Sequence, residues 1–168
     1  MALHIILTGG TIDKHYNELS GKINFSDSHI DKMLAQARST APVSINRVMM
    51  KDSLDMTPED RIVIAQACEQ TPETRIIIMH GTDTMSETAV VLAHTPNLTH
   101  KTIVLTGAMI PYSFGGKSDA QFNLGTAFAF AQSLPAGIYI AMNGRFFKSN
   151  NVQKDKTVGT FTELSDNL

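Results

Sequence analysis

Two uninterrupted apolar runs, Ile76–Ile78 and Ile103–Leu105, constrain the fold of this chain more than any other feature of its sequence. A strand that is solvated on one face alternates apolar and polar residues, whereas a parallel strand covered on both faces is continuously apolar. Segments with helical character separate the apolar runs, and strands that alternate with helices indicate a mainly parallel sheet covered by helices. The sequence therefore predicts a three-layer α/β domain with a largely parallel sheet.

The expected elements follow one another along the chain without an internal repeat or a linker. Strands are expected at residues 4–7, 43–50, 75–79, 101–105 and 138–142, and helices at residues 27–38, 57–70, 86–93 and 119–131. Thr57 and Pro58 are a typical helix start, with a capping hydroxyl before a proline. Asp119 is expected to cap the last helix. Residues 145–162 are expected to form a β-hairpin that turns at Asn150-Asn151.

Composition excludes several classes of function. The chain has 168 residues, enough for one domain, which we expect to span residues 1–168. Its net charge is −2 and it has no basic stripe, which argues against a nucleic-acid partner. No apolar run is long enough to cross a membrane, and no signal-peptide pattern precedes the first strand, so we expect a cytoplasmic protein. The single cysteine, Cys68, is expected to be packed in a helix, and the scattered histidines predict no metal site.

Hydroxyl-bearing residues follow three of the expected strands, at the edge where ligands bind in open α/β sheets. Thr11 follows Gly9-Gly10, Ser53 follows the strand at 43–50, and Thr82 lies in the segment His80–Met85. The start of the next helix favours an anion or a developing oxyanion there. For one such motif alone, a capping or turn role is about as plausible as a site.

The segment from Asp13 to Ser26 is polar and lacks a clear periodicity, which is typical of a mobile lid. Tyr16 is its only tyrosine. A lone tyrosine in a lid is more often a packing or rim residue than a catalyst.

No histidine is placed as a general base for these hydroxyls, because His80 precedes the glycine and is expected to point into the sheet edge. A Ser-His-Asp triad is therefore not indicated. A threonine can still be a nucleophile if another group takes its proton, and a buried neutral lysine or a tyrosine can do so. Lys154 is a candidate because it follows the apolar Val152 in the expected hairpin, although most hairpin lysines are solvated.

The motifs together resemble the bacterial-type L-asparaginases. The first signature matches Thr8–Ile12 and the second matches His80–Met85. The resemblance continues through further segments in the same order, at Ser53–Met56, Thr106–Met109, Ser118-Asp119 with Phe122–Leu124, and Val152–Lys154 with Thr157 and Phe161. It covers nearly the whole chain.

The resemblance implies a role for each matching residue. Thr11 matches the nucleophile that attacks the side-chain amide and forms an acyl-enzyme, and Thr82 matches the second catalytic threonine. Lys154 matches the lysine that bonds the second threonine. Asp83 matches the aspartate that holds the substrate α-amino group. The remaining matches are Ser53 for the α-carboxylate, the Ala108 carbonyl for the substrate amide, and Tyr16 for the lid tyrosine, which lies farther from its threonine in the family.

The resemblance further implies hydrolysis of L-asparagine to L-aspartate and ammonia, with no metal or organic cofactor. The usual family chain is about twice as long, and its second domain completes the site across a dimer interface. We therefore expect a homo-oligomer with weaker or altered substrate binding. Asp13 stands where the family usually has a small residue, so the geometry of the lid is expected to differ from that in the family.

Two alternatives remain open at this stage. One is a non-catalytic amino-acid-binding module that keeps the pocket without turnover. The other is an amidase that acts on glutamine or a related carboxamide with the same nucleophile.

Overall fold

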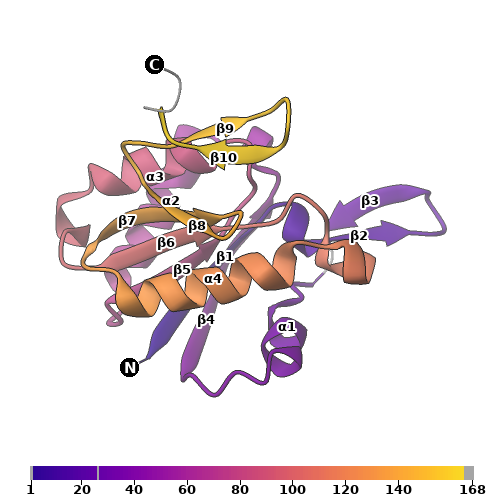
Figure 1. Cartoon of the computed structure of the whole chain (residues 1–168), viewed down its shortest axis with the longest axis horizontal. Helices are drawn as coiled ribbons and strands as arrows, with labels where there is room; N and C mark the ends of the chain where they lie inside the picture. Colours follow the sequence, from indigo (N-terminus) through magenta and orange to yellow (C-terminus); the bar gives the residue numbers. More distant parts are fainter. Residues whose placement is uncertain (1, 26, 165–168) are drawn as a thin grey trace.

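A six-stranded sheet forms the centre of the protein (Figure 1), as seen in a computed structural model that describes residues 2–25 and 27–164. All neighbouring strands run parallel except the last, which is antiparallel. Across the sheet the order is β4 (Val43–Lys51), β1 (Leu3–Gly9), β5 (Arg75–Met79), β6 (Thr102–Thr106), β7 (Gly137–Met142) and β8 (Arg145–Lys148). Ser26 of the expected lid and residues 1 and 165–168 of the expected domain lie outside the described residues.

Helices cover both faces of the sheet, which confirms the predicted three-layer α/β fold. Helices α2 (Pro58–Gln70) and α3 (Met85–Ala93) lie on one face, and α1 (Ile30–Gln36) and α4 (Ala120–Ser133) lie on the other (Figure 1). Each face has its own apolar core. Successive residues of β5 alternate between the two cores, because Ile76 and Ile78 pack on one face and Ile77 on the other. This explains why the run is apolar without interruption.

Local sequence signals fix the start of α2. The Thr57 hydroxyl accepts a hydrogen bond from the Asp60 N–H, and the Asp60 carboxylate accepts one from the Thr57 N–H. This reciprocal pair satisfies two N–H groups that a helix start would otherwise leave without partners. Cys68 is buried in the same helix, as expected, and burial raises the pKa of its thiol to about 12.

The segment expected to be a mobile lid contains a β-hairpin, which its lack of clear periodicity did not predict. Strands β2 (Lys14–Asn17) and β3 (Lys22–Phe25) pair antiparallel and project from the body of the molecule (Figure 1). The Asn17 side chain accepts hydrogen bonds from the Leu19 and Ser20 N–H groups. These bonds organise the turn that ends at Gly21.

The C-terminal hairpin is present, but its predicted turn was wrong. Its strands are β9 (Gln153–Asp155) and β10 (Thr160–Thr162), so the turn lies between residues 155 and 160. Strand β8 pairs with β7 instead, through the turn at Asn143 and Gly144. Both turn residues have positive φ, at 56° and 76°, as a two-residue turn of type I′ requires. Asn150 and Asn151 lie in the connection from β8 to β9.

Asp119 precedes α4, as predicted, but its side chain makes no capping hydrogen bond to that helix. Its carboxylate instead accepts hydrogen bonds from the backbone N–H groups of Met109 and Ile110. The short helices η1 (Thr11–Asp13), η2 (Ser53–Asp55), η3 (Pro96–Leu98) and η4 (Tyr112–Lys117) complete the fold. Among the described helices, none combines the length and apolar character that crossing a bilayer requires.

Candidate active site

The loops that follow β1 and β5 touch through their glycines. Gly10 has a φ of +87°, and a Cβ atom built on it would lie 2.4 Å from the backbone nitrogen of Gly81. Only glycine allows this combination of a positive φ and a direct approach of two backbones. Thr11 and Thr82 are the next residues in these two loops, so they leave adjacent points of the same sheet edge.

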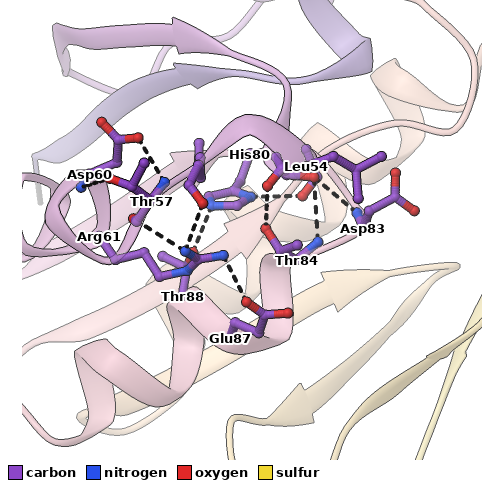
Figure 2. Close-up of polar contacts among 12 residues, drawn as sticks. Leu54, Thr57, Asp60, Arg61, His80, Asp83, Thr84, Glu87 and Thr88 are labelled. Atoms are coloured by element: carbon purple, nitrogen blue, oxygen red, sulfur yellow. Dashed lines mark hydrogen bonds and ion pairs between the residues drawn. The ribbon is translucent and has the colours of Figure 1, made fainter.

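Ser53 joins a third loop to this edge. Its side chain is buried, and its Oγ accepts hydrogen bonds from the N–H groups of Asp83 at 3.2 Å and Thr84 at 3.4 Å. The Thr84 hydroxyl in turn donates to the Ser53 carbonyl at 2.8 Å. Figure 2 shows these bonds beside the labelled Asp83 and Thr84. The serine therefore lies against the start of α3, where it already occupies two N–H groups.

Lys154 reaches Thr82 and Asp83 from the C-terminal hairpin. Its ammonium donates to the Thr82 Oγ1 at 2.8 Å and to the Asp83 Oδ1 at 2.8 Å. The lysine side chain is only 9% exposed and the Asp83 side chain is 33% exposed, so both interactions are partly buried. The Thr82 hydroxyl has a weak contact with the Met109 sulfur at 3.5 Å. Residues more than seventy positions apart thus form one polar cluster.

The hairpin holds Lys154 through its own packing. Lys154 is paired across the hairpin with Phe161, which is buried in the core with Val152. The Phe161 N–H donates to the Asn143 side chain at 2.9 Å, which ties β10 to the β7–β8 turn. The lysine is therefore supported by two buried apolar neighbours, although most hairpin lysines are solvated.

Both ring nitrogens of His80 are hydrogen-bonded to groups next to the site. It is completely buried, with its Nδ1 2.7 Å from the Gly81 carbonyl and its Nε2 2.8 Å from the Thr88 hydroxyl (Figure 2). A carbonyl can only accept, so Nδ1 carries the proton and Nε2 accepts from Thr88. Burial lowers the His80 pKa to about 4, which keeps the ring neutral at pH 7. Both ring nitrogens are occupied, so His80 is not available as a general base.

An ion pair links the β2–β3 hairpin to the Ser53 loop. Lys14 binds the carboxylate of Asp52, and Lys14 also lies over the ring of Phe25. Burial acts to raise the Asp52 pKa, but hydrogen bonds from Lys14 and the Leu54 N–H, with the charges of Lys14 and Lys154, lower it below the usual value. Asp52 therefore keeps its charge beside Ser53. Sequence reasoning missed this pair, although Asp52 directly precedes the serine.

Ala108 and Tyr16 differ in their burial and in their position relative to this cluster. Ala108 is buried just beyond the end of β6, next to β5 in the sheet. Tyr16 lies on β2 and is 57% exposed. Within the part of the chain that the structure describes, no hydrogen bond joins Tyr16 to Thr11, Thr82 or Lys154. The structure therefore gathers Ser53, Thr82, Asp83 and Lys154 by direct contacts and Thr11 through its adjoining loop, while Tyr16 stands apart.

Asp13 has an unexpected structural role. It is buried, and its Oδ1 accepts from the Ser28 hydroxyl at 2.8 Å and the His29 N–H at 3.1 Å. The aspartate thereby fixes the segment that leads into α1. No group of three or more His, Cys, Asp or Glu side chains among the described residues could hold a metal ion.

Replacing Gly10 by alanine should destabilise the fold more than replacing Gly21. Both glycines have positive φ, but a Cβ at Gly21 meets nothing within 4 Å, whereas one at Gly10 overlaps Gly81. We expect Gly10→Ala to lose about 1–3 kcal/mol more unfolding free energy than Gly21→Ala, because the clash adds to the shared backbone strain. Urea titrations of the two variants measure the difference, and equal losses would contradict the close backbone contact.

His80 should make the fold less stable in acid. Its folded pKa of about 4 lies below the ordinary 6.5, so the unfolded chain binds a proton between these values while the folded chain does not. Stability is therefore complete above pH 6.5 and decreases as the pH falls toward 4, by ~3 kcal/mol from this group. Urea titrations at pH 7 and 4.5 should show a smaller acid loss in His80→Gln than in the wild type. The exposed His100→Gln should keep the wild-type loss, and an unchanged loss in His80→Gln would refute this assignment.

Comparison with solved structures gives close matches among L-asparaginases. The thermostable L-asparaginase from Thermococcus kodakarensis is 31% identical, with a TM-score of 0.84 over 97% of this chain and 51% of its own. L-asparaginase I from Vibrio cholerae is 26% identical, with a TM-score of 0.83 over 96% and 51%. A probable cytoplasmic L-asparaginase from Campylobacter jejuni is 28% identical, with a TM-score of 0.82 over 96% and 52%. This chain thus spans about half the length of these proteins.

The family model described as asparaginase, N-terminal, matches residues 2–165. A comparison with curated proteins gave no match. The matched residues contain all of the strand-end loops and the hairpin that bears Lys154. On this combination of family match, fold and sequence identity, the chain belongs to the asparaginase family and corresponds to its N-terminal domain.

Proposed function

We propose that residues 1–168 form a catalytic domain that hydrolyses L-asparagine to L-aspartate and ammonia, with Thr11 as the nucleophile. The observation that carries this proposal is the contact of the Lys154 ammonium with both Thr82 and Asp83, beside the loop that bears Thr11. The family match supports an amidohydrolase of the asparaginase type. L-asparagine is the substrate named for the matching L-asparaginases, and we extend it to this chain as part of the proposal.

The substrate is anchored by its two charged main-chain groups. Asp83 shares one carboxylate oxygen with Lys154, and its carboxylate can accept from the α-ammonium of asparagine. The Ser53 hydroxyl lies at the N-terminal end of α3, where the helix dipole favours the α-carboxylate. Two fixed anchors deliver the side-chain amide in one orientation, which removes much of the entropic cost of the reaction.

The reaction then proceeds in two steps. The Thr11 oxygen attacks the amide carbon, and the hydroxyl proton passes to the leaving nitrogen. Ammonia then departs, and an aspartyl ester of Thr11 remains. Water next attacks the ester carbon, one of its protons passes to the Thr11 oxygen, and aspartate is released. Backbone N–H groups near Thr82 stabilise the oxyanion in both steps, and one such donor can contribute ~3 kcal/mol. No metal or organic cofactor is required by these steps.

Lys154 and Thr82 act together on the second step in this proposal. The lysine ammonium donates to the Thr82 oxygen, so the threonine proton, which makes only the weak contact with the Met109 sulfur, can be directed at a water or at the substrate. Tyr16 is proposed to relay the Thr11 proton, for which the β2–β3 hairpin must bring the exposed phenol to the threonine. The Lys14–Asp52 ion pair ties that hairpin to the Ser53 loop and therefore supports such an approach.

A homo-oligomer and a cytoplasmic location are further parts of the proposal. Leu54 and Val158 are each 67% exposed. Leu54 adjoins Ser53, and Val158 precedes Gly159, which lies against Met109. Exposed apolar side chains around the site support its coverage by a second copy of the chain. One matching protein is named a probable cytoplasmic L-asparaginase, which supports the same location here.

Thr11→Ala should abolish ammonia release while it preserves ligand binding. Removing the nucleophile is expected to lower turnover of L-asparagine by roughly 10³-fold or more. Ser53 and Asp83 remain, so L-aspartate should bind with a similar dissociation constant. A coupled ammonia assay and isothermal titration measure the two quantities, and Thr99→Ala, at an exposed threonine, is the matched control.

The outcome also separates the alternatives. Wild-type binding of asparagine without turnover would support the amino-acid-binding module instead. Faster ammonia release from glutamine or another carboxamide would keep the nucleophile and change the substrate. Asparagine and glutamine differ by one methylene, which a pocket discriminates by about 1–3 kcal/mol. Full activity in Thr11→Ala would overturn the proposed mechanism.

A further inference from the structure

The loop that follows β6 is held on both sides by the start of α4. The Asp119 carboxylate accepts from the Met109 N–H at 3.0 Å and from the Ile110 N–H at 3.0 Å. The Asn123 amide donates to the Gly107 carbonyl at 3.0 Å and to the Asp119 carboxylate at 2.9 Å. Asn123 is buried, so its bond to the Gly107 carbonyl is shielded from water, whereas the Asp119 bonds to Met109 and Ile110 are exposed. Two side chains one helical turn apart thus fix the residues before and after Ala108.

The Ala108 carbonyl itself has no partner. Within residues 2–25 and 27–164, no backbone or side-chain group donates a hydrogen bond to this oxygen, although Ala108 is only 1% exposed. Buried carbonyls without a donor are uncommon, and each calls for an explanation. The Gly107 carbonyl accepts from Asn123, and the Ile110 carbonyl accepts from the Ser118 hydroxyl. Met109 lies between Ala108 and Ile110 and is 38% exposed, whereas Ala108 is buried. Ala108 therefore combines burial with a carbonyl that has no donor.

This acceptor lies beside the candidate active site. Strand β6 is the neighbour of β5, and Met109, the residue after Ala108, contacts the Thr82 hydroxyl through its sulfur. A carbonyl oxygen at this edge complements a ligand that brings its own N–H groups. The primary amide of asparagine has two such donors, and they become stronger as the nitrogen gains a proton and leaves.

We propose that Asp119 and Asn123 are positioning residues that hold the Ala108 carbonyl ready for the amide N–H of the substrate. The inference rests on the proposed asparaginase function and adds residues that do not touch the substrate. An acceptor aimed at the leaving nitrogen binds the transition state more strongly than the ground state, so its loss lowers kcat rather than raising KM. The Asp119 charge serves the loop rather than its helix, because its side chain makes no capping bond to α4.

The substitution Asp119→Asn tests the proposal, because it nearly preserves the shape of the side chain but removes its charge and one acceptor oxygen. In the wild type, Oδ1 accepts from the Met109 and Ile110 N–H groups, and Oδ2 accepts from the Met109 N–H and the Asn123 amide. An amide nitrogen in place of Oδ2 is a donor, so it cannot accept from Met109 or Asn123. We expect kcat for L-asparagine to fall by about 10–100-fold with little change in KM. The β-methyl ester of L-aspartate has no amide N–H for the carbonyl to accept, so its hydrolysis should fall less than threefold. Asp119→Glu keeps both acceptor oxygens and should retain more of the amide turnover than Asp119→Asn.

Controls distinguish positioning from a general loss of structure. Inhibition by L-aspartate and the thermal midpoint should stay near wild-type values in Asp119→Asn, and Asp31→Asn, at an exposed residue of α1, should change neither substrate. Equal losses on amide and ester, a matching loss of aspartate binding, or unchanged amide turnover would each overturn the inference. Failure of the wild type to release ammonia from asparagine would instead refute the proposed function, so the two failures are distinguishable.

Discussion

The direct contact of backbone with backbone at the carboxyl edge of the sheet is the constraint on which the site depends. Gly10 meets Gly81 without an intervening side chain, and a Cβ on Gly81 would lie 2.7 Å from the Cβ of Ser53. Three loops from β1, β4 and β5 are thereby brought closer than side chains would allow. The contact brings together the loops whose hydroxyls are proposed to act on one small molecule. His80 reinforces the contact from below, since it binds the Gly81 carbonyl in a fully buried position.

The second requirement is the long-range approach of Lys154. An ammonium this far from water has a large desolvation cost, which one carboxylate offsets only with good geometry and further hydrogen bonds. Asp83 and Thr82 supply both, and the packing of Val152 and Phe161 places the hairpin where the lysine reaches them. A partly buried pair of this kind is weak evidence of stability, because replacing such a pair by apolar side chains is often neutral. Its presence is consistent with the proposed chemistry at the Thr82 oxygen.

Sequence reasoning succeeded where the signal is local or periodic. The apolar runs at Ile76–Ile78 and Ile103–Leu105 identified parallel strands, and Thr57 with Pro58 located the start of α2. The β2–β3 hairpin was missed because its exposed strands contribute little to the core, and the turn at Asn143-Gly144 was overlooked in favour of Asn150-Asn151. Asp119 was read as a helix cap because the loop that uses its carboxylate is ten positions away in sequence. The Lys154 contacts could be inferred only through the family resemblance, since a hairpin lysine alone predicts a solvated side chain.

A crystal structure with bound L-aspartate would test the proposed site, because the product has the α-amino and α-carboxyl groups of the substrate. We expect its side-chain carboxylate to lie between Thr11 and Thr82, with the α-ammonium on Asp83 and the α-carboxylate at Ser53. Aspartate bound instead in the hollow that Phe130 and Phe146 line against β8, with the threonine loops empty, would contradict it.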